Sequence, residues 1–155
     1  MPLEEKEIRL TKSGRAFSGF LELTLNADQI LMLQKLGRKR LLRPGERLLP
    51  VGSIVDRVYI LKAGAAEILA PGSNGEGQMM KAVGPGEILG LTEALAGTTS
   101  DFAISAASES VFTELPREEF ITFLRKDADM CFDLVSMMAT AFVQCIHVVS
   151  GGSTR

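Results

Sequence analysis

Residues 58–70 have the sequence V-Y-I-L-K-A-G-A-A-E-I-L-A, in which two short apolar runs flank Gly64. A short apolar run that stops at a glycine is typical of a β-strand that leads into a turn. Similar runs occur at residues 48–49, 79–83, 103–107 and 111–115. The breaks between them are rich in glycine and proline, as in P-G-S-N-G-E-G at residues 71–77, a predicted hairpin tip. Several short strands at this spacing predict an all-β sandwich or barrel.

Helices are predicted on both sides of this β-rich region. Residues 23–36 carry apolar side chains at helical spacing, and Asn26 or Asp28 could cap the first turn. Gly37 is a plausible end for this helix. Pro116 is predicted at the first position of a second helix, where proline is favoured and where the following glutamates suit the helix dipole.

The apolar segment at residues 130–149 is long enough to cross a membrane. Its polar residues, however, recur at steps of three and four and form one stripe on a helix. The stripe consists of Asp133, Ser136, Thr140, Gln144 and His147. A lipid-exposed span would rarely contain an aspartate or collect its polar groups on one face. We therefore predict a helix of a soluble protein, without membrane association.

The rest of this helix carries two apolar stripes. The first has heptad a and d spacing and consists of Cys131, Leu134, Met138, Ala141, Cys145 and Val148. The second consists of Val135, Ala139, Phe142, Ile146 and Val149. One stripe can pack on the helix's own domain, and the other then needs a partner, because a long exposed apolar stripe favours association. We predict a parallel homodimer with Leu134, Met138, Ala141, Cys145 and Val148 at its interface. The pattern leaves open which stripe faces the partner, and a helix buried in a single core is the alternative.

Composition limits the possible functions. The chain has 155 residues, of which 46% are hydrophobic and 23% charged, as in one ordinary globular domain. A net charge of -2 gives no positive field for nucleic acid or an anionic membrane. Two cysteines fit a reducing, cytoplasmic setting. The single histidine excludes a multi-histidine metal site, and the chain has no G-x-S-x-G motif and no P-loop, so we predict no catalytic residue, no metal site and no enzyme activity.

Basic residues gather in residues 35–47, where only Glu46 opposes them. They are Lys35, Arg38, Lys39, Arg40, Arg43 and Arg47. The simpler interpretation is a solvated strand edge and loop. A contact surface for an acidic partner is the alternative.

Residues 84–97, G-P-G-E-I-L-G-L-T-E-A-L-A-G, form a turn that leads into a short helix predicted to start near Gly90. The N-terminus of a helix exposes unpaired N–H groups that can hold an anion. A glycine at that entrance lets a ligand approach the backbone closely. Thr98, Thr99 and Ser100 then add three hydroxyl groups. Together these features indicate a site for a small anion.

In the order of its parts, the chain resembles the cyclic-nucleotide-binding domain of the catabolite-activator (Crp/Fnr) superfamily over about residues 18–149. The matching pieces are R-P-G-E-R-L-L-P-V at 43–51, V-Y-I-L-K-A-G-A-A-E-I at 58–68, residues 84–97, residues 103–115 and the two closing helices. The resemblance implies a mainly β fold, a β jelly roll (double-stranded β-helix) flanked by an N-terminal helix and a long C-terminal helix that often mediates dimerisation. It divides the chain into a leader at 1–17, the jelly roll with its N-terminal helix at 18–126, a signalling and dimerisation helix at 127–150, and a tail at 151–155.

In that family, residues 84–101 correspond to the phosphate-binding cassette. The usual cassette has F-G-E followed by an aliphatic stretch and P-R-x-A; its glutamate takes the ribose hydroxyl and its arginine pairs with the cyclic phosphate. This chain has Leu91 at the glutamate position and no arginine in residues 99–101. Leu89 replaces the aromatic residue, and Asp101 would repel a phosphate. The departures predict weak or absent binding of cyclic AMP.

The resemblance implies a ligand site for a cyclic nucleotide or another small anion, with no other cofactor. Its residues would be Gly86, Glu87, Gly90, Leu91, Thr92, Glu93, Thr98, Thr99 and Ser100. We expect a regulatory, ligand-sensing domain that transmits its signal through the C-terminal dimer helix. The alternatives are a ligand-free adaptor or oligomerisation domain, and the N-terminal sensor half of a truncated transcription regulator that does bind a cyclic nucleotide. We expect no DNA binding by this chain alone, because no DNA-binding domain follows the last helix.

Overall fold

The computed structural model of the protein describes residues 23–72 and 77–153, with side chains described up to residue 147. The predicted leader and the tip of the 71–77 hairpin therefore lie largely outside the described residues. The chain divides into two compact units. One spans Thr24–Met130 and contains both sheets; the other includes most of the long C-terminal helix.

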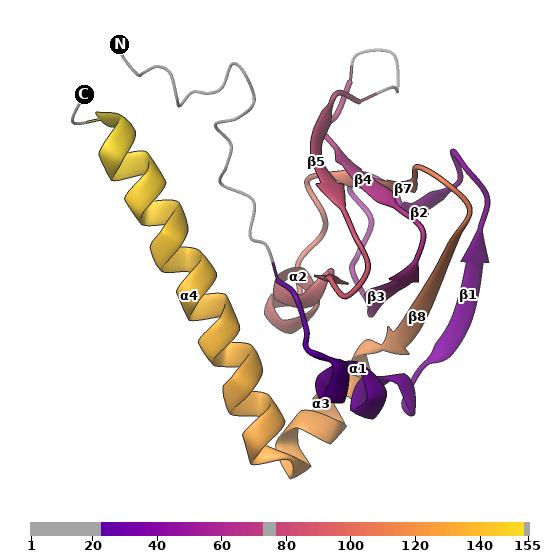
Figure 1. Ribbon diagram of the computed structural model, residues 1–155, viewed down its shortest axis with the longest axis vertical. Helices are drawn as coiled ribbons and strands as arrows, with labels where there is room; N and C mark the ends of the chain where they lie inside the picture. The colour runs from indigo at the N-terminus through magenta and orange to yellow at the C-terminus, as the bar shows by residue number, and fades with distance from the viewer. Residues whose placement is uncertain (1–22, 73–76, 154–155) are drawn as a thin grey trace. The chain divides into compact units, whose positions relative to one another are not determined.

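Two antiparallel sheets of four strands each form the body of the first unit (Figure 1). The first sheet has the order β1 (Arg38–Leu42), β8 (Ser110–Pro116), β3 (Arg57–Ala63) and β6 (Ile88–Leu89). The second has the order β2 (Arg47–Leu49), β7 (Ala103–Ala106), β4 (Ala66–Leu69) and β5 (Met79–Val83). Strands near opposite ends of the unit pair with each other, as β1 does with β8 in the register Arg38↔Glu114 to Leu42↔Ser110. This arrangement confirms the predicted mainly β jelly roll with flanking helices.

The core contains many aliphatic and aromatic side chains of β3 and β8, and they lie on both faces of this strand pair. Val58, Ile60, Leu61, Phe112 and Leu115 are completely buried. Burying each of these larger side chains contributes about 1.5–3 kcal/mol relative to leaving it in water. The β3–β8 pair therefore provides a firm base on which the turn after β5 and the short helix α2 (Leu91–Ala96) are placed.

Two strands lie where the sequence pattern gave little or no strand signal. β1 contains three successive basic residues, which form a solvated strand edge as the simpler interpretation of the basic stretch proposed. β6 is only two residues long and lies between the Gly84–Gly86 turn and α2. Such a short strand has no periodicity of its own, and its pairing with Tyr59 and Ile60 of β3 defines it.

The helices differ from the prediction mainly at their ends. α1 (Ala27–Gln34) is shorter than the predicted helix, and Asn26 rather than Asp28 caps it through a reciprocal pair of hydrogen bonds with Gln29. α3 (Arg117–Lys126) begins one residue later than predicted. Pro116 is the N-cap and not the first helical residue, because it is still the last residue of β8 and has an extended ψ of 141°.

The C-terminal helix α4 spans Ala128–Ser153, and the side chain of Asp127 caps it by accepting a hydrogen bond from the N–H of Met130 at 3.0 Å. By length and composition alone, this helix is also apolar enough to cross a membrane. On the first predicted stripe, Leu134 and Ala141 are buried; on the second, Val135, Phe142 and Ile146 are exposed. The exposed set also includes Phe132 and Val143.

Candidate functional site

The glycine-rich turn between β5 and β6 is held by backbone hydrogen bonds. The N–H of Gly86 donates to the carbonyl of Leu61, and the carbonyl of Gly86 accepts from the N–H of Leu25, both at 2.8 Å. Gly86 has a φ of 94°, a region that glycine enters without strain. The turn is thereby fixed between β3 and the segment that precedes α1.

Glu87 closes this turn with a buried carboxylate. Its Oε2 accepts a hydrogen bond from the N–H of Gly84 at 3.0 Å, and its Oε1 lies 2.7 Å from Nζ of Lys81. The ammonium of Lys81 also donates to the carbonyl of Ala82 at 3.0 Å. Only 16% of the Lys81 side chain and 11% of the Glu87 side chain are exposed. A charge pair therefore lies at the start of the cassette segment, residues 84–101.

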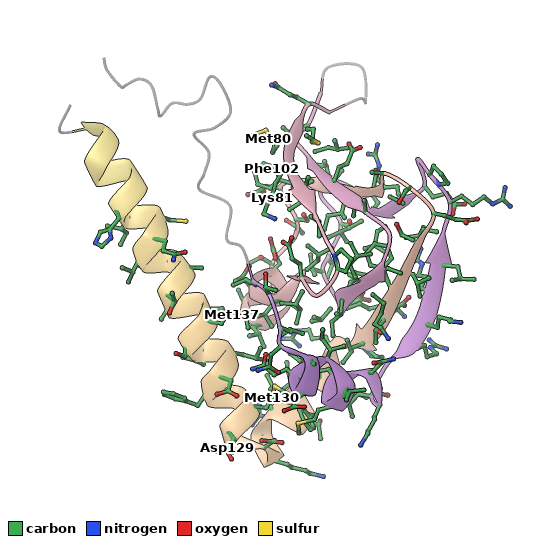
Figure 2. All side chains as sticks on the ribbon, viewed as in Figure 1. Met80, Lys81, Phe102, Asp129, Met130 and Met137 are labelled. Carbon is green, nitrogen blue, oxygen red and sulfur yellow. The ribbon has the colours of Figure 1, made fainter. Side chains whose placement is uncertain are left out.

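The strand register places Lys81 on the inner face of its sheet, and Figure 2 labels this residue on β5. Lys81 is opposite Ile68, which is in turn opposite Ile104. Two residues further along β5, Val83 shares this face because successive side chains alternate, and it is only 2% exposed. The ammonium thus extends from the same side of β5 as the core side chains.

The predicted short helix is present, and Gly90 is its N-cap with a φ of 79°. No side-chain hydrogen bond caps α2 among the described residues. A Cβ atom on Gly90 would lie 3.2 Å from the carbonyl oxygen of Arg57 and 3.3 Å from Cγ1 of Val55. The glycine therefore allows α2 to pack closely on β3 and on the loop before it.

Leu91 follows Gly90 at the position that the resemblance assigns to the family's ribose-binding glutamate. It is 1% exposed and belongs to the core. Thr92 and Glu93, which come next, are half-buried, and the hydroxyl of Thr92 donates to the carboxylate of Glu93 at 3.1 Å. The carbonyl of Glu93 accepts from Gly97 and Thr98 and ends the helix.

Residues 98–102 include the positions, 99–101, that the resemblance assigns to the family's Pro-Arg element. Ser100 is 4% exposed, and its hydroxyl donates to the carbonyl of Phe102 at 2.6 Å while accepting from the N–H of Phe102. The backbone of Ser100 pairs with Gly52 and Ser53. Thr98, Thr99 and Asp101 are exposed. The Ser100 hydroxyl is thus used within the loop.

The nearby guanidinium groups have protein partners. Arg117 donates from Nε to the carbonyl of Ala94 at 2.5 Å. Arg57 and Arg40 share the carboxylate of Glu114, with N–O distances of 2.8 and 3.6 Å. The Nε–H of Arg57 makes no well-directed hydrogen bond, so its contact with Glu114 is chiefly electrostatic. Among the described residues there is no group of three side chains suited to hold a metal ion.

Lys81 is the charged residue near the cassette that the sequence prediction did not include. A weak signal existed, since residues 79–83, M-M-K-A-V, place one charged residue inside an apolar strand. That pattern also fits an exposed lysine on an amphipathic strand, and only the register with β4 separates the two cases.

The fold is thus a mainly β jelly roll with a glycine-rich turn, a short helix and a long C-terminal helix. The model of the cyclic nucleotide-binding domain family matches residues 39–127, and the chain belongs to this family.

Solved structures of Crp/Fnr type share the fold. The catabolite activator protein of Thermus thermophilus is 17% identical, with a TM-score of 0.71, over 83% of this chain and 61% of that protein. The N-terminal domain of a transcriptional regulator from Streptomyces coelicolor is 20% identical, with a TM-score of 0.65, over 77% of this chain and 86% of that one. A cyclic nucleotide-binding-like protein of Brucella abortus is 28% identical, with a TM-score of 0.55, over 64% and 85%. No curated protein sequence matches the chain.

Proposed function

We propose that this chain is a regulatory ligand-sensing domain of the Crp/Fnr type in which the usual binding of cyclic AMP is weak or absent. The observation that supports this most directly is the composition and bonding of residues 98–102. This loop contains no arginine, and its buried hydroxyl, that of Ser100, is already bonded to Phe102.

The energetic consequence is large enough to change the function. Each charge-assisted hydrogen bond to a ligand contributes about 1.5–3 kcal/mol. An arginine can form two such bonds with a phosphate, and its loss alone removes most of the affinity for a cyclic nucleotide. Leu91 adds to the loss, because a buried leucine offers no acceptor for a ribose hydroxyl.

Isothermal titration calorimetry with cyclic AMP tests this proposal. We expect no measurable heat of binding at ligand concentrations up to about 100 μM, which corresponds to a Kd weaker than that range. The variant Thr99→Arg, at an exposed position of the same loop, is titrated in parallel to show whether an arginine in this loop restores binding. Micromolar affinity of the natural protein for cyclic AMP would contradict the proposal.

We further propose that α4 transmits the signal as the helix of a homodimer in the cytoplasm, as a regulator and not as an enzyme. Its exposed Phe142 and Ile146 support this, because an apolar stripe of this length favours association. Sedimentation velocity of two variants, Met138→Glu on the first stripe and Phe142→Glu on the second, identifies the stripe that faces the partner. A monomeric natural protein at micromolar concentration would contradict the dimer.

The apolar surface of α4 also favours a second function, a ligand-free adaptor or oligomerisation domain. Thermal denaturation separates the two functions, since a sensor gains stability with its ligand by mass action and an adaptor does not. The chain spans 61% of the length of the Thermus thermophilus protein. A role as the sensor part of a longer transcription regulator is therefore a third possibility, which a DNA-binding assay on the longer gene product would test.

A further inference from the structure

The ion pair of Lys81 and Glu87 lies on the inner side of β5, in a domain whose other inward side chains there are apolar. Ile68 and Ile104 share the face of Lys81, and Ile104 and Val83 are at most 5% exposed. The side chain of Lys81 is 16% exposed, so part of it is still accessible to solvent. The pair adjoins the cassette segment, because Glu87 is its fourth residue.

Stability alone does not account for a charge pair at this place. Removing two charges from water costs several kcal/mol per ion, and apolar side chains of similar volume often stabilise a core at least as well. The turn uses the bond from the N–H of Gly84 to the carboxylate of Glu87, and Lys81 neutralises that carboxylate, which would be costly to bury alone. A neutral acceptor such as glutamine at residue 87 would serve the turn without a lysine.

The chemistry of Lys81 suits an anionic ligand. Its ammonium has three donor hydrogens, of which Glu87 and the carbonyl of Ala82 receive two. No other residue of the described part of the chain accepts the third, which an incoming oxygen could take. A lysine acts as a compact point charge and does not impose the planar, two-pronged geometry of an arginine. It therefore favours a single charged group over the paired recognition of a cyclic phosphate.

We propose that Lys81 binds the anionic group of a small phosphate-bearing ligand on the inner face of β5, with Glu87 as its counter-ion when no ligand is bound. This inference rests on the proposed function as a ligand-sensing domain and names the group that replaces the missing arginine. The anion competes with the carboxylate of Glu87 for the ammonium. Glu87 therefore weakens ligand binding, and the ammonium of Lys81 provides the main attraction for the anion.

Two substitutions with opposite expected effects test the proposal. Glu87→Gln keeps an acceptor for Gly84 but removes the competing charge, so we expect inorganic phosphate to bind about tenfold more tightly than to the natural protein. Lys81→Met removes the cation, and we expect phosphate to give no thermal stabilisation up to about 10 mM. Lys62→Met on β3 is the matched control and should behave like the natural protein. Lys81→Arg keeps the charge and shows whether any loss in Lys81→Met reflects misfolding.

Equal stabilisation by phosphate in Lys81→Met and the natural protein would overturn the proposal. The absence of phosphate binding in folded Glu87→Gln would do so too, because a merely structural pair predicts that both substitutions only destabilise the domain. Cyclic AMP and cyclic GMP in the same assay separate a phosphate ester from free phosphate as the ligand source. Tight binding of cyclic AMP that survives Lys81→Met would contradict the proposed function and this inference together. Tight binding that Lys81→Met abolishes would contradict only the former.

Discussion

The Nε atom of Arg117, at the first position of α3, donates a hydrogen bond to the carbonyl of Ala94 in α2 at 2.5 Å. The backbone N–H of Arg117 also donates to the carbonyl of Asp56, in the loop before β3, at 2.9 Å. One residue thereby joins the cassette helix to the start of the C-terminal helices and to the sheet. The side chain of Arg117 thus connects α2 directly to α3.

Replacing Arg117 by methionine should uncouple α2 from α3. We expect the free energy of unfolding to fall by about 1–2 kcal/mol, because a buried carbonyl loses a charged donor. Relative to the natural protein, the variant should show a larger increase in the rate of hydrogen exchange in α2 than in β3. Arg125→Met, at an exposed position in the last turn of the same helix, is the control. Equal losses of stability in the two variants would contradict a specific role of Arg117.

Gly90 and Gly45 form a matched pair of substitution sites, which tests how closely the entrance of the cassette segment is packed. Both have a positive φ, 79° and 86°, but an added Cβ meets protein atoms only at Gly90. Gly45→Ala should cost about 1 kcal/mol, the strain of the left-handed backbone alone. Gly90→Ala should cost more, since the carbonyl of Arg57 and the side chain of Val55 must also move. Urea denaturation of the two variants measures the difference, and a smaller loss for Gly90→Ala would show that α2 is loosely seated.

A substitution at Leu91 tests whether the position assigned to the family's ribose-binding glutamate is part of the core in this protein. Leu91→Glu buries a carboxylate where 1% of the side chain is exposed, so we expect a loss of at least about 2 kcal/mol. Ala96→Glu, on the exposed side of the same helix, should change stability by less than about 0.5 kcal/mol. Restoring the family glutamate without its arginine should therefore destabilise the domain and create no cyclic AMP site. Calorimetry and urea denaturation of the same samples check both parts.

The sequence was sufficient to predict those elements whose side chains carry a strong local pattern. The strands around Gly64 and the helix start at Gly90 follow from residue type and spacing, and the same pattern limited the cap of α1 to Asn26 or Asp28. β6 was missed because its two residues pair with β3 through tertiary contact alone.

The charge pair of the site was missed for a related reason. Glu87 was predicted as a site residue from its motif, whereas Lys81 lies outside the cassette segment. Its inward direction depends on the pairing of Lys81 with Ile68 and of Ile68 with Ile104. Strand register is a property of the folded sheet, and one residue of slippage would have turned the lysine toward solvent.

Tyr59 makes the stability of the domain depend on pH in the alkaline range. Burial raises the pKa of Tyr59 above its ordinary value of 10.0, and the carboxylate of Glu114 adds to this, while Arg40 and Arg57 oppose it. The unfolded chain therefore releases the phenol proton at a lower pH than the folded protein does. The stabilising contribution is complete below about pH 10 and is lost as the pH rises through the folded-state pKa.

Tyr59→Phe removes this ionisation, so its free energy of unfolding should fall less steeply above about pH 10 than that of the natural protein. Because Tyr59 is the only tyrosine and the chain has no tryptophan, phenolate absorbance reports its ionisation without interference. The folded protein should develop this absorbance at a higher pH than the protein in urea does. Coincident titration curves in the two states would contradict the burial of the phenol group, and with it the close packing of β3 between β6 and β8.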